Sequence, residues 1–514
     1  MQVASADAVR NPGRPERFEV VIVGSGFSGI AMGILLEKAG IDAYVILEKA
    51  SDVGGTWRDN TYPGAACDIP SHLYSFSFEP KPDWSRAFPP QQEIHDYLRA
   101  CVDKHGLRSH IRFRSEVKGA TFDEREGTWT VRVADGSTVV GRALVLGNGA
   151  LHIPAYPEIE GLESFEGTTF HSARWNHDYD LRGKRVAVIG TGASAIQFVP
   201  EIAPLVGSMK VFQRTPPWIL PKPDRPMTER EKWIFRYVPG ARWLYRAYTY
   251  WMHELRAIGF VIDPRLMKQA EKLAKRYLAK TVRDPELRAK LTPNYTMGCK
   301  RILMSNDYYQ TLQRDNVKLV TDAIRRVTPK GIETADGVMH EVDAIIFGTG
   351  FTATDYLAPL DIQGLDGKLL NDVIRERPET YLGITIHGFP NLYLMMGPNT
   401  GLGHNSMVFM IEAQARWALQ AIQKLRRDDL AYMDVDPKVQ RAFNERIQAK
   451  LAHSVWNSGC QSWYLKDGYN ATIWPGFTWQ YWLETRWLRP AEFRCVKRED
   501  ASAMGAGALV GAAA

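Results

Sequence analysis

Two charged residues, one acidic and one basic, occupy the same place in two similar segments of the chain. Glu48 lies 24 residues after Gly24, and Arg214 lies 24 residues after Gly190. A carboxylate accepts hydrogen bonds from ribose hydroxyls and repels a 2′-phosphate, whereas a guanidinium followed by Thr215 binds that phosphate directly. The difference predicts two dinucleotide sites, with FAD at the first and NADPH at the second. A surface arginine at the end of a strand is the alternative for Arg214.

The first segment, FEVVIVGSGFSGIAMGILLEKAGIDAYVILEK, predicts a strand, a glycine-rich turn, a helix and a second strand that ends at Glu48. Glycine permits the tight turn, the approach of a pyrophosphate and close helix packing, and the helix N-terminus then faces the phosphates. A tight turn in an unrelated α/β domain explains the glycines but not the acidic residue. The residues expected to bind FAD here are Gly24, Gly26, Phe27, Ser28, Gly29 and Glu48.

The second segment, KRVAVIGTGASAIQFVPEIAPLVGSMKVFQRTP, repeats the pattern with alanine, an accepted variant, at the third position. An apolar strand that ends in glycines, DAIIFGTGF at 343–351, is typical of the stretch that closes a nicotinamide domain. The candidates for NADPH binding are Thr191, Gly192, Ala193, Ser194, Ala195, Gln197, Arg214 and Thr215.

To position these residues the chain needs an α/β fold with two Rossmann-like dinucleotide-binding domains, for FAD and for NADPH, both discontinuous. The stretch 229–291 is rich in Trp, Tyr, Leu, Lys and Arg and predicts a helical insertion over the active site. From Phe389 a strand, a Gly/Asn loop and a long helix are expected to complete the first domain. The expected boundaries are 15–150 for the first part of the FAD-binding domain, 151–222 for the linker and the first part of the NADPH-binding domain, 223–298 for the helical insertion, 299–384 and 385–500 for the second parts of the NADPH-binding and FAD-binding domains, and 501–514 for a disordered tail.

The composition is that of a globular protein and argues against several classes. The 514 residues carry a net charge of +6 from scattered Lys and Arg, which makes no case for a nucleic acid partner. No apolar run approaches the ~20 residues that span a bilayer, so no membrane partner is expected. Five dispersed cysteines without a CxxC or CxxxxC pair indicate a reducing cytoplasm and no metal site. The oligomeric state stays open.

Between the two glycine-rich turns lies FEGTTFHSARW, which places Phe165, Gly167, His171 and Trp175 at fixed spacing. Two dinucleotide sites imply hydride transfer from NADPH to flavin, and without a CxxxxC pair the expected electron acceptor is O2. The stretch resembles the FxGxxxHxxxW signature of type I Baeyer–Villiger monooxygenases. The chain departs from the usual pattern at Asn176, where family members commonly have Pro or Asp.

Two further segments carry the same resemblance, which extends from about Arg17 to Arg494. GGTWRDNTYPGAACD at 54–68 is similar to the segment that lines the flavin, and MGCKRILMSNDYY carries Lys300 and Arg301. The resemblance implies a contact with NADP for Lys300 and Trp463, and a place beside the flavin for Tyr62. It also implies that the residues in contact with FAD include Gly55, Thr56, Trp57, Asp68, Tyr74, Val117 and Met407.

The resemblance also implies roles. Arg301 would be the catalytic cation that keeps a C4a-peroxyflavin anionic and stabilises the addition intermediate, and Asp68 would hold it over the flavin. His171 would hold the linker between the domains; a histidine merely satisfied by packing is the alternative.

The reaction implied is the insertion of one oxygen atom from O2 beside a ketone carbonyl, to give an ester or lactone. One alternative is a flavin-containing monooxygenase that oxidises nitrogen or sulfur, which Arg301 and Trp175 disfavour. The other is a scaffold or NADPH sensor that binds both cofactors without turnover. The loop GPNTGLGHNSM at 397–407 hints at linear aliphatic or more varied ketones, and the sequence leaves the ketone itself open.

Overall fold

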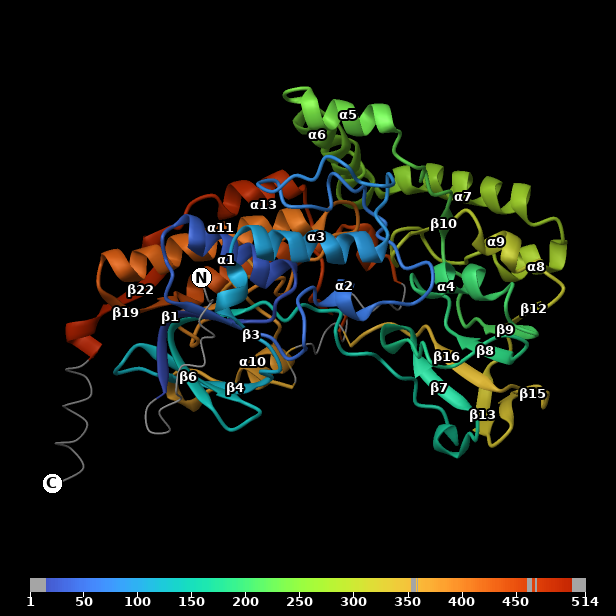
Figure 1. Cartoon of the computed structure of the whole chain (residues 1–514), viewed down its shortest axis with the longest axis horizontal. Coiled ribbons are helices and arrows are strands. Elements are labelled where there is room, and N and C mark those ends of the chain that lie inside the picture. The colour runs from blue at the N-terminus through green and yellow to red at the C-terminus, as the bar shows by residue number, and fades with distance from the viewer. Residues whose placement is uncertain (1–14, 353–356, 358, 460–464, 467–468, 502–514) are drawn as a thin grey trace, which may run out of the picture.

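The computed structural model describes residues 15–352, 357, 359–459, 465–466 and 469–501. Figure 1 shows two lobes, each built on its own sheet, with two short helices projecting at the top. We call the lobe with the N-terminal strand the first lobe and the other the second lobe. The expected disordered tail lies, except for Ala501, outside the described residues.

The sheet of the first lobe has the strand order β17-β4-β5-β6-β1-β2-β3, and β18 also pairs with β6. Strand β1 pairs in parallel with β2 and β6, whereas β4, β5 and β6 form an antiparallel meander. In β1, Val20 and Ile22 enter one hydrophobic cluster and Val21 and Val23 another, because successive side chains point to opposite faces. The strands are β1 Glu16–Val23, β2 Tyr44–Leu47, β3 Ile111–Arg112, β4 Val117–Asp123, β5 Thr128–Val133, β6 Thr138–Leu146, β17 Asp361–Gln363 and β18 Leu392–Leu394.

Helices α1, α3 and α11 lie together above this sheet (Figure 1), and α1 packs against α11. The chain after Phe389 returns as the sequence predicts, through β18, a loop and α11. A small antiparallel pair, β19 with β22, follows at the edge of the lobe. The bounds are α1 Phe27–Lys38, α2 Thr56–Asp59, α3 Gln91–Lys104, α10 Leu370–Glu376, α11 Met407–Arg427, β19 Leu430–Val435, α12 Pro437–Ala452, α13 Thr478–Thr485 and β22 Phe493–Lys497.

The second lobe contains a five-stranded parallel sheet in the order β12-β9-β8-β16-β7. Within the segment 317–337, only β12 belongs to this sheet. The turn at Pro329 then folds β13 back on β14, and these form a separate antiparallel sheet with β15. The bounds are β7 Thr168–His171, β8 Arg185–Ile189, α4 Ala195–Ile202, β9 Ser208–Phe212, α9 Tyr308–Thr311, β12 Val317–Val320, β13 Ile324–Thr328, β14 Gly331–Thr334, β15 Met339–Glu341 and β16 Ala344–Phe347.

The expected insertion is helical. It contains α5 Glu229–Tyr237, α6 Ala241–Glu254, α7 Met267–Thr281 and α8 Pro285–Lys290, and the short parallel pair β10 Ile219–Leu220 with β11 Leu303–Met304 closes its base. Thr228 begins α5 with a capping box to Glu231. Backbone hydrogen bonds from Met227 to Ser85 and from Ala87 to Arg225, both 2.9 Å, join the insertion to the first lobe. No helix in the described part of the chain is both long and apolar enough to cross a bilayer.

The cysteine pattern predicts reduced thiols, and the structure differs from this expectation at one position. Cys67, Cys101 and Cys495 are free thiols, whereas Cys299 is disulfide-bonded. A dispersed set of cysteines carries no spacing signal for a bond between distant segments, so sequence reasoning could not anticipate it.

Candidate functional site

The turn after β1 brings bare backbone together where the first cofactor is expected. A Cβ at Gly24, whose φ is +91°, would lie 2.9 Å from the carbonyl oxygen of Gly147, and one at Gly29 would lie 1.9 Å from that of Gly24. In the following loop a Cβ at Gly55 would approach the Cα of Gly26 to 3.2 Å. This crowding admits only glycine at positions 24 and 29, beside the N-terminus of α1, where a pyrophosphate can reach the backbone N–H groups.

Glu48 directly follows β2, and four donors fix the position of its buried carboxylate. Its Oε2 accepts from the backbone N and the Oγ of Ser25 at 2.9 and 2.7 Å, and its Oε1 accepts from Ala50 N at 2.9 Å and Arg58 Nη1 at 3.0 Å. Ser115 N donates to the Glu48 carbonyl, which brings the start of β4 at Val117 beside it. The pairing of Arg58, in α2, with Glu48 was not predicted, because a cation ten residues away carries no motif that identifies its partner.

Three aromatic residues expected near the flavin lie together. The rings of Phe27 and Tyr74 are 5.2 Å apart and those of Trp57 and Tyr74 are 5.6 Å apart, both edge to face. Trp57 Nε1 donates to the Tyr74 hydroxyl at 3.2 Å, and both side chains are half-buried. Thr56 begins α2, and Met407, half-buried, begins α11.

The two residues expected to be catalytic are in contact although 233 positions separate them. Oδ2 of Asp68 accepts from Nε of Arg301 at 3.1 Å and from Nη2 at 2.5 Å. Burial alone would raise the pKa of Asp68, but the guanidinium outweighs burial and holds that pKa below its usual value. Asp68 is therefore ionised at neutral pH and fixes the plane of a cation whose side chain remains 43% exposed.

The second glycine-rich turn packs against the end of β16, the strand predicted from DAIIFGTGF. A Cβ at Gly190 would lie 2.5 Å from the carbonyl oxygen of Gly348, and one at Gly348 would lie 3.1 Å from the Cβ of Ala195. Thr191 Oγ1 donates to the backbone oxygen of Thr215 at 3.3 Å. The turn, the start of α4 and the end of β16 thus meet, as the sequence predicts.

Two cations from different segments meet beside this turn. Arg214 follows β9 and is exposed, and Lys300 is half-buried near it. Burial, and next the positive charge of Arg214, lower the pKa of Lys300. An anion bound between the two side chains would relieve this repulsion, which is the arrangement expected for a 2′-phosphate.

Gln197 joins the lobes instead of facing the NADPH cradle. Its Oε1 accepts from the hydroxyl of Tyr62 at 2.9 Å and from Ala66 N at 3.3 Å, and its Nε2 donates to Ala66 O at 3.0 Å. Its side-chain amide therefore binds the first lobe through both atoms, and Tyr62 is a partner of α4. Trp463 lies outside the described residues.

His171 is buried at the end of an edge strand, β7, which belongs to the second sheet and not to a free linker. Its Nδ1 accepts from Ala173 N at 3.0 Å. Burial lowers the pKa of His171 to about 4, so the ring is neutral at physiological pH. Its ring lies 5.4 Å from that of Tyr156 and 6.0 Å from that of Phe351, residues of the two segments that connect the lobes.

The two connecting segments, 153–155 and 350–352, run side by side over His171. Ala155 N donates to Gly350 O at 2.9 Å, and Thr352 N donates to Ile153 O at 3.0 Å. The linker role expected for His171 fits this contact.

The other signature residues pack inside the second lobe. Trp175 lies 5.1 Å from the ring of Phe170 and 5.3 Å from that of Phe198. A Cβ at Gly167 would lie 2.5 Å from the Phe165 ring, so that glycine leaves room for the aromatic side chain.

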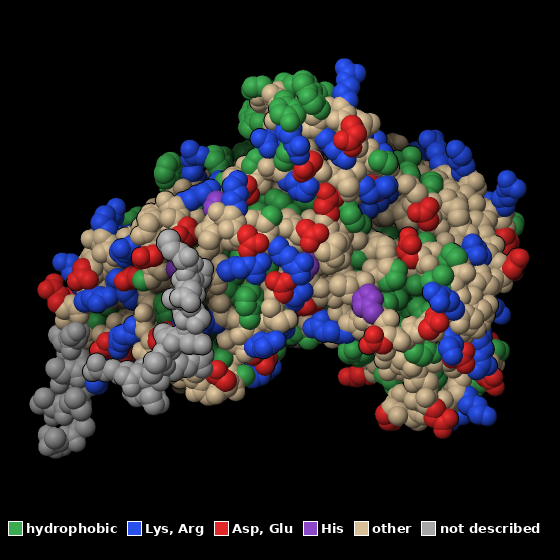
Figure 2. Space-filling view, in the orientation of Figure 1, with side chains coloured by type: hydrophobic (Ala, Val, Ile, Leu, Met, Phe, Trp, Pro, Cys, Tyr) green, Lys and Arg blue, Asp and Glu red, His purple; other side chains and the backbone are tan. Residues whose placement is uncertain are grey.

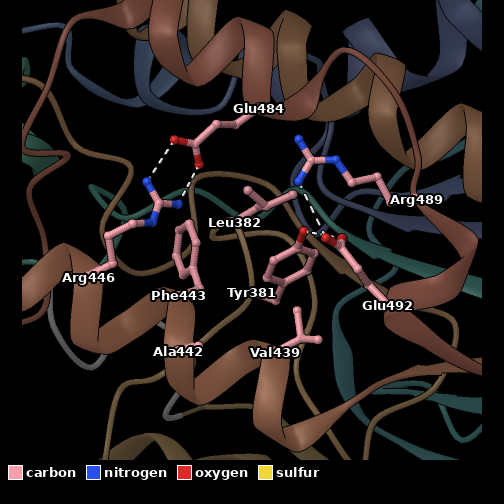
Figure 3. A pocket seen from close by; sticks show the side chains of 9 residues that line it. All are labelled: Tyr381, Leu382, Val439, Ala442, Phe443, Arg446, Glu484, Arg489 and Glu492. Carbon is pink, nitrogen blue, oxygen red and sulfur yellow. Dashed lines mark hydrogen bonds and ion pairs between the residues drawn. The ribbon is translucent and has the colours of Figure 1, made fainter.

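A cavity of about 450 Å³ lies away from all of these residues, beside α12 and α13 (Figure 3). Arg446 binds Glu484 through two contacts of 2.8 and 2.7 Å, and Arg489 lies 3.3 Å from Glu492. Because its charged groups already neutralise one another and no predicted site residue lines it, this cavity is not the candidate active site.

Comparison with known proteins agrees with the geometry. Residues 21–228 match the family model described as pyridine nucleotide-disulphide oxidoreductase. The chain is 51% identical to a Baeyer–Villiger monooxygenase of Pseudomonas aeruginosa, over 92% of this chain and 91% of that protein. It is 44% identical to a Baeyer–Villiger monooxygenase of Streptomyces coelicolor, over 94% and 93%.

Solved structures give the same result. OTEMO in complex with FAD and NADP superposes with a TM-score of 0.86 at 28% identity, over 94% of this chain and all of that one. Cyclohexanone monooxygenase from Rhodococcus sp. Phi1 bound to NADP+ superposes with a TM-score of 0.84 at 29% identity over the same shares. With two glycine cradles, a carboxylate-held arginine and this degree of identity along nearly its whole length, the chain belongs to the Baeyer–Villiger monooxygenases.

Proposed function

We propose that this protein is an FAD-containing, NADPH-dependent monooxygenase that converts a ketone into an ester or lactone. One atom of O2 enters the product and the other leaves as water, with NADPH and a proton supplying the two reducing equivalents. The observation that carries the proposal is Arg301, held by Asp68 at 3.1 and 2.5 Å in a chain with two dinucleotide cradles.

The residues present fit FAD in the first lobe. The crowded glycines leave only backbone N–H groups for the pyrophosphate, and Glu48 supplies carboxylate oxygens for the adenosine ribose. Ribose hydroxyls would share these oxygens with Ser25 and Arg58, which hold the carboxylate in place. Phe27, Trp57 and Tyr74 offer an apolar wall for the ring system.

The residues present also fit NADPH in the second lobe. Arg214 and Lys300 place two positive charges together, and the hydroxyl of Thr215 follows directly in the chain. Charge-assisted hydrogen bonds to a 2′-phosphate would distinguish NADPH from NADH, which lacks that group.

When bound, the flavin accepts hydride from NADPH and activates O2. The chain then has to stabilise negative charge on oxygen atoms, first on the activated oxygen and next on the former carbonyl oxygen of the ketone. The guanidinium of Arg301 suits this because it donates several hydrogen bonds and does not give up a proton at working pH. Asp68 is a positioning residue that keeps the guanidinium preorganised, which is the condition for electrostatic stabilisation of a transition state.

The test is a panel of linear, cyclic and aromatic ketones incubated with the holoenzyme, NADPH and ¹⁸O2. We expect one labelled oxygen atom in an ester or lactone, identified by mass spectrometry, and NADPH consumption that matches product. Organic sulfides and amines are the control substrates. Oxidation of those alone, or NADPH consumption that yields only hydrogen peroxide, would contradict the proposal.

A further inference from the structure

Helix α6 is amphipathic, but its polar side faces the protein and its apolar side faces solvent. Its buried residues are the polar side chains of Thr249, His253 and Glu254. Its outward side chains are large and apolar, and each is between 47% and 70% exposed: Trp243, Leu244, Tyr248, Trp251, Met252 and Leu255. A helix that only covered the active site would turn its apolar stripe inward.

The polar inner side of α6 is bonded to the first lobe. Glu254 accepts from Asn405 Nδ2 at 2.5 Å and from Thr478 Oγ1 at 2.8 Å, both in the first lobe. Arg246 donates to the carbonyl oxygen of His72 at 2.5 Å. These bonds fix the orientation of the helix, so the outward position of the apolar stripe is built in and not the result of a loose helix.

Helix α5 continues the same surface. Trp233, Tyr237 and Val238 are 58%, 61% and 42% exposed, and the rings of the first two lie 5.6 Å apart. Figure 2 shows hydrophobic side chains gathered at the top of the molecule, over α5 and α6, with Lys and Arg side chains around the base of the cluster. We call the exposed apolar residues of α5 and α6, with Val238 and Leu255 at their ends, the outer aromatic face.

The insertion that carries this face is basic, and the part that contains α5 and α6, residues 223–256, has 7 Lys and Arg against 4 Asp and Glu. Residues 223–298 contain 16 Lys and Arg against 8 Asp and Glu, an excess of 8 in an insertion of a chain whose net charge is only +6. The remainder of the chain is therefore slightly acidic. Arg230 on α5 and Arg256, which directly follows Leu255, are exposed at the borders of the face.

We propose that the outer aromatic face docks on an anionic lipid surface. Trp and Tyr favour the boundary between water and hydrocarbon, and flanking Lys and Arg are attracted to anionic headgroups. A helix that lies in this boundary needs no bilayer-spanning length, which is consistent with the helices described above. A second copy of the chain suits the face less well, because two-fold pairing would set one basic insertion against the other.

The docked orientation would bring the insertion side of the active site toward the lipid. Glu254 at the end of α6 binds Asn405, two residues before Met407, for which the family resemblance implies a contact with FAD. Apolar ketones concentrate in lipid, so a site that opens beside the bilayer would meet its substrates there. The docking itself does not depend on the proposed reaction.

The test is flotation of the full-length holoenzyme with vesicles. The probes are phosphatidylcholine vesicles with and without phosphatidylglycerol. The variant is Trp243→Gln/Trp251→Gln/Leu255→Gln, and the matched control is Leu205→Gln/Val338→Gln, which changes two apolar side chains exposed by 49% and 46% in the second lobe. We expect the protein and the control to float with the anionic vesicles, and partition of the triple variant to fall about tenfold or more. High salt should weaken binding.

Two results would overturn the proposal. One is absence of the holoenzyme from the floated anionic vesicles, with circular dichroism showing a folded protein. The other is a concentration-dependent dimer, measured by analytical ultracentrifugation, that the triple variant abolishes while vesicle binding is unchanged. The second result would assign the face to a second copy of the chain.

Discussion

Replacing Asp68 with Asn tests whether this carboxylate orients the reacting cation. The substitution keeps the size of the side chain but removes the charge that receives two N–H donors of Arg301. A hydrogen bond to a charged group contributes ~1.5–3 kcal/mol. Because the side chains of Arg301 and Asp68 are 43% and 29% exposed, screening reduces the expected loss to about 1–2 kcal/mol. That corresponds to a roughly 5- to 30-fold slower oxygen insertion.

Arg301→Ala is the matched and more severe change, because it removes the cation itself. Loss of one preorganised contact to a developing oxyanion costs ~2.7–4 kcal/mol, or about 100- to 1,000-fold in rate. The rate of oxygen insertion should therefore be highest in the wild-type protein, lower in Asp68→Asn and lowest in Arg301→Ala.

The assay separates the two halves of the reaction. Stopped-flow absorbance under anaerobic conditions measures flavin reduction by NADPH, which forms no oxyanion and should change little in Asp68→Asn. Ester formation, followed by chromatography, should fall, and hydrogen peroxide release should rise. Because Arg301 holds the pKa of Asp68 below its usual value, the wild-type contact should persist as the pH falls through the ordinary range of aspartate and be lost only below it.

The reasoning would be refuted by an Asp68→Asn protein that makes ester at the wild-type rate with the same peroxide release. An Arg301→Ala protein that remains nearly as active would remove the cation from the chemistry. That outcome would favour oxidation of sulfur or nitrogen instead.

Other predictions address the second lobe and the linker. Arg214→Ala should lower the preference for NADPH over NADH, measured as the ratio of kcat/KM values, by roughly tenfold or more; an unchanged ratio would reject the phosphate site. His171→Ala should slow turnover and raise peroxide release while FAD stays bound, and loss of flavin with tight coupling in the remaining holoenzyme would exclude a linker role. Burial lowers the pKa values of His72, His171 and His253 to about 4, so the unfolded chain takes up these protons first. Stability should be complete above about pH 6.5 and decline toward pH 4 by up to about 3 kcal/mol per histidine, so a Tm that does not change over this range would contradict the shifts.

The sequence predicted best those features that depend on local backbone geometry. The crowding around Gly24, Gly29 and Gly190 leaves no room for another residue, so a spacing of glycines was enough to place both turns. Glu48 and Arg214 lie directly after β2 and two residues after β9, so their positions could be counted from the glycines.

Features that depend on contacts between distant segments were less accessible. Gln197 was expected at NADPH and Tyr62 beside the flavin, but their side chains form a hydrogen bond that joins the lobes, which no local pattern indicates. The pairing of Arg58 with Glu48 and the separate sheet of β13, β14 and β15 have the same origin. The contact of Asp68 with Arg301 was predicted only because the family resemblance connected two motifs that are remote in the chain.

The division of the first lobe between the two ends of the chain determines the order in which the lobes can be completed on the ribosome. All five strands of the second sheet have been synthesised when Phe347 is added. The first sheet, which starts at Glu16, still lacks β17 and β18 at that point, and the indole of Trp129 still lacks its acceptor, the carbonyl oxygen of Pro390. The lobe that begins first therefore closes last, and a nascent chain can present a complete nicotinamide cradle before it can retain flavin.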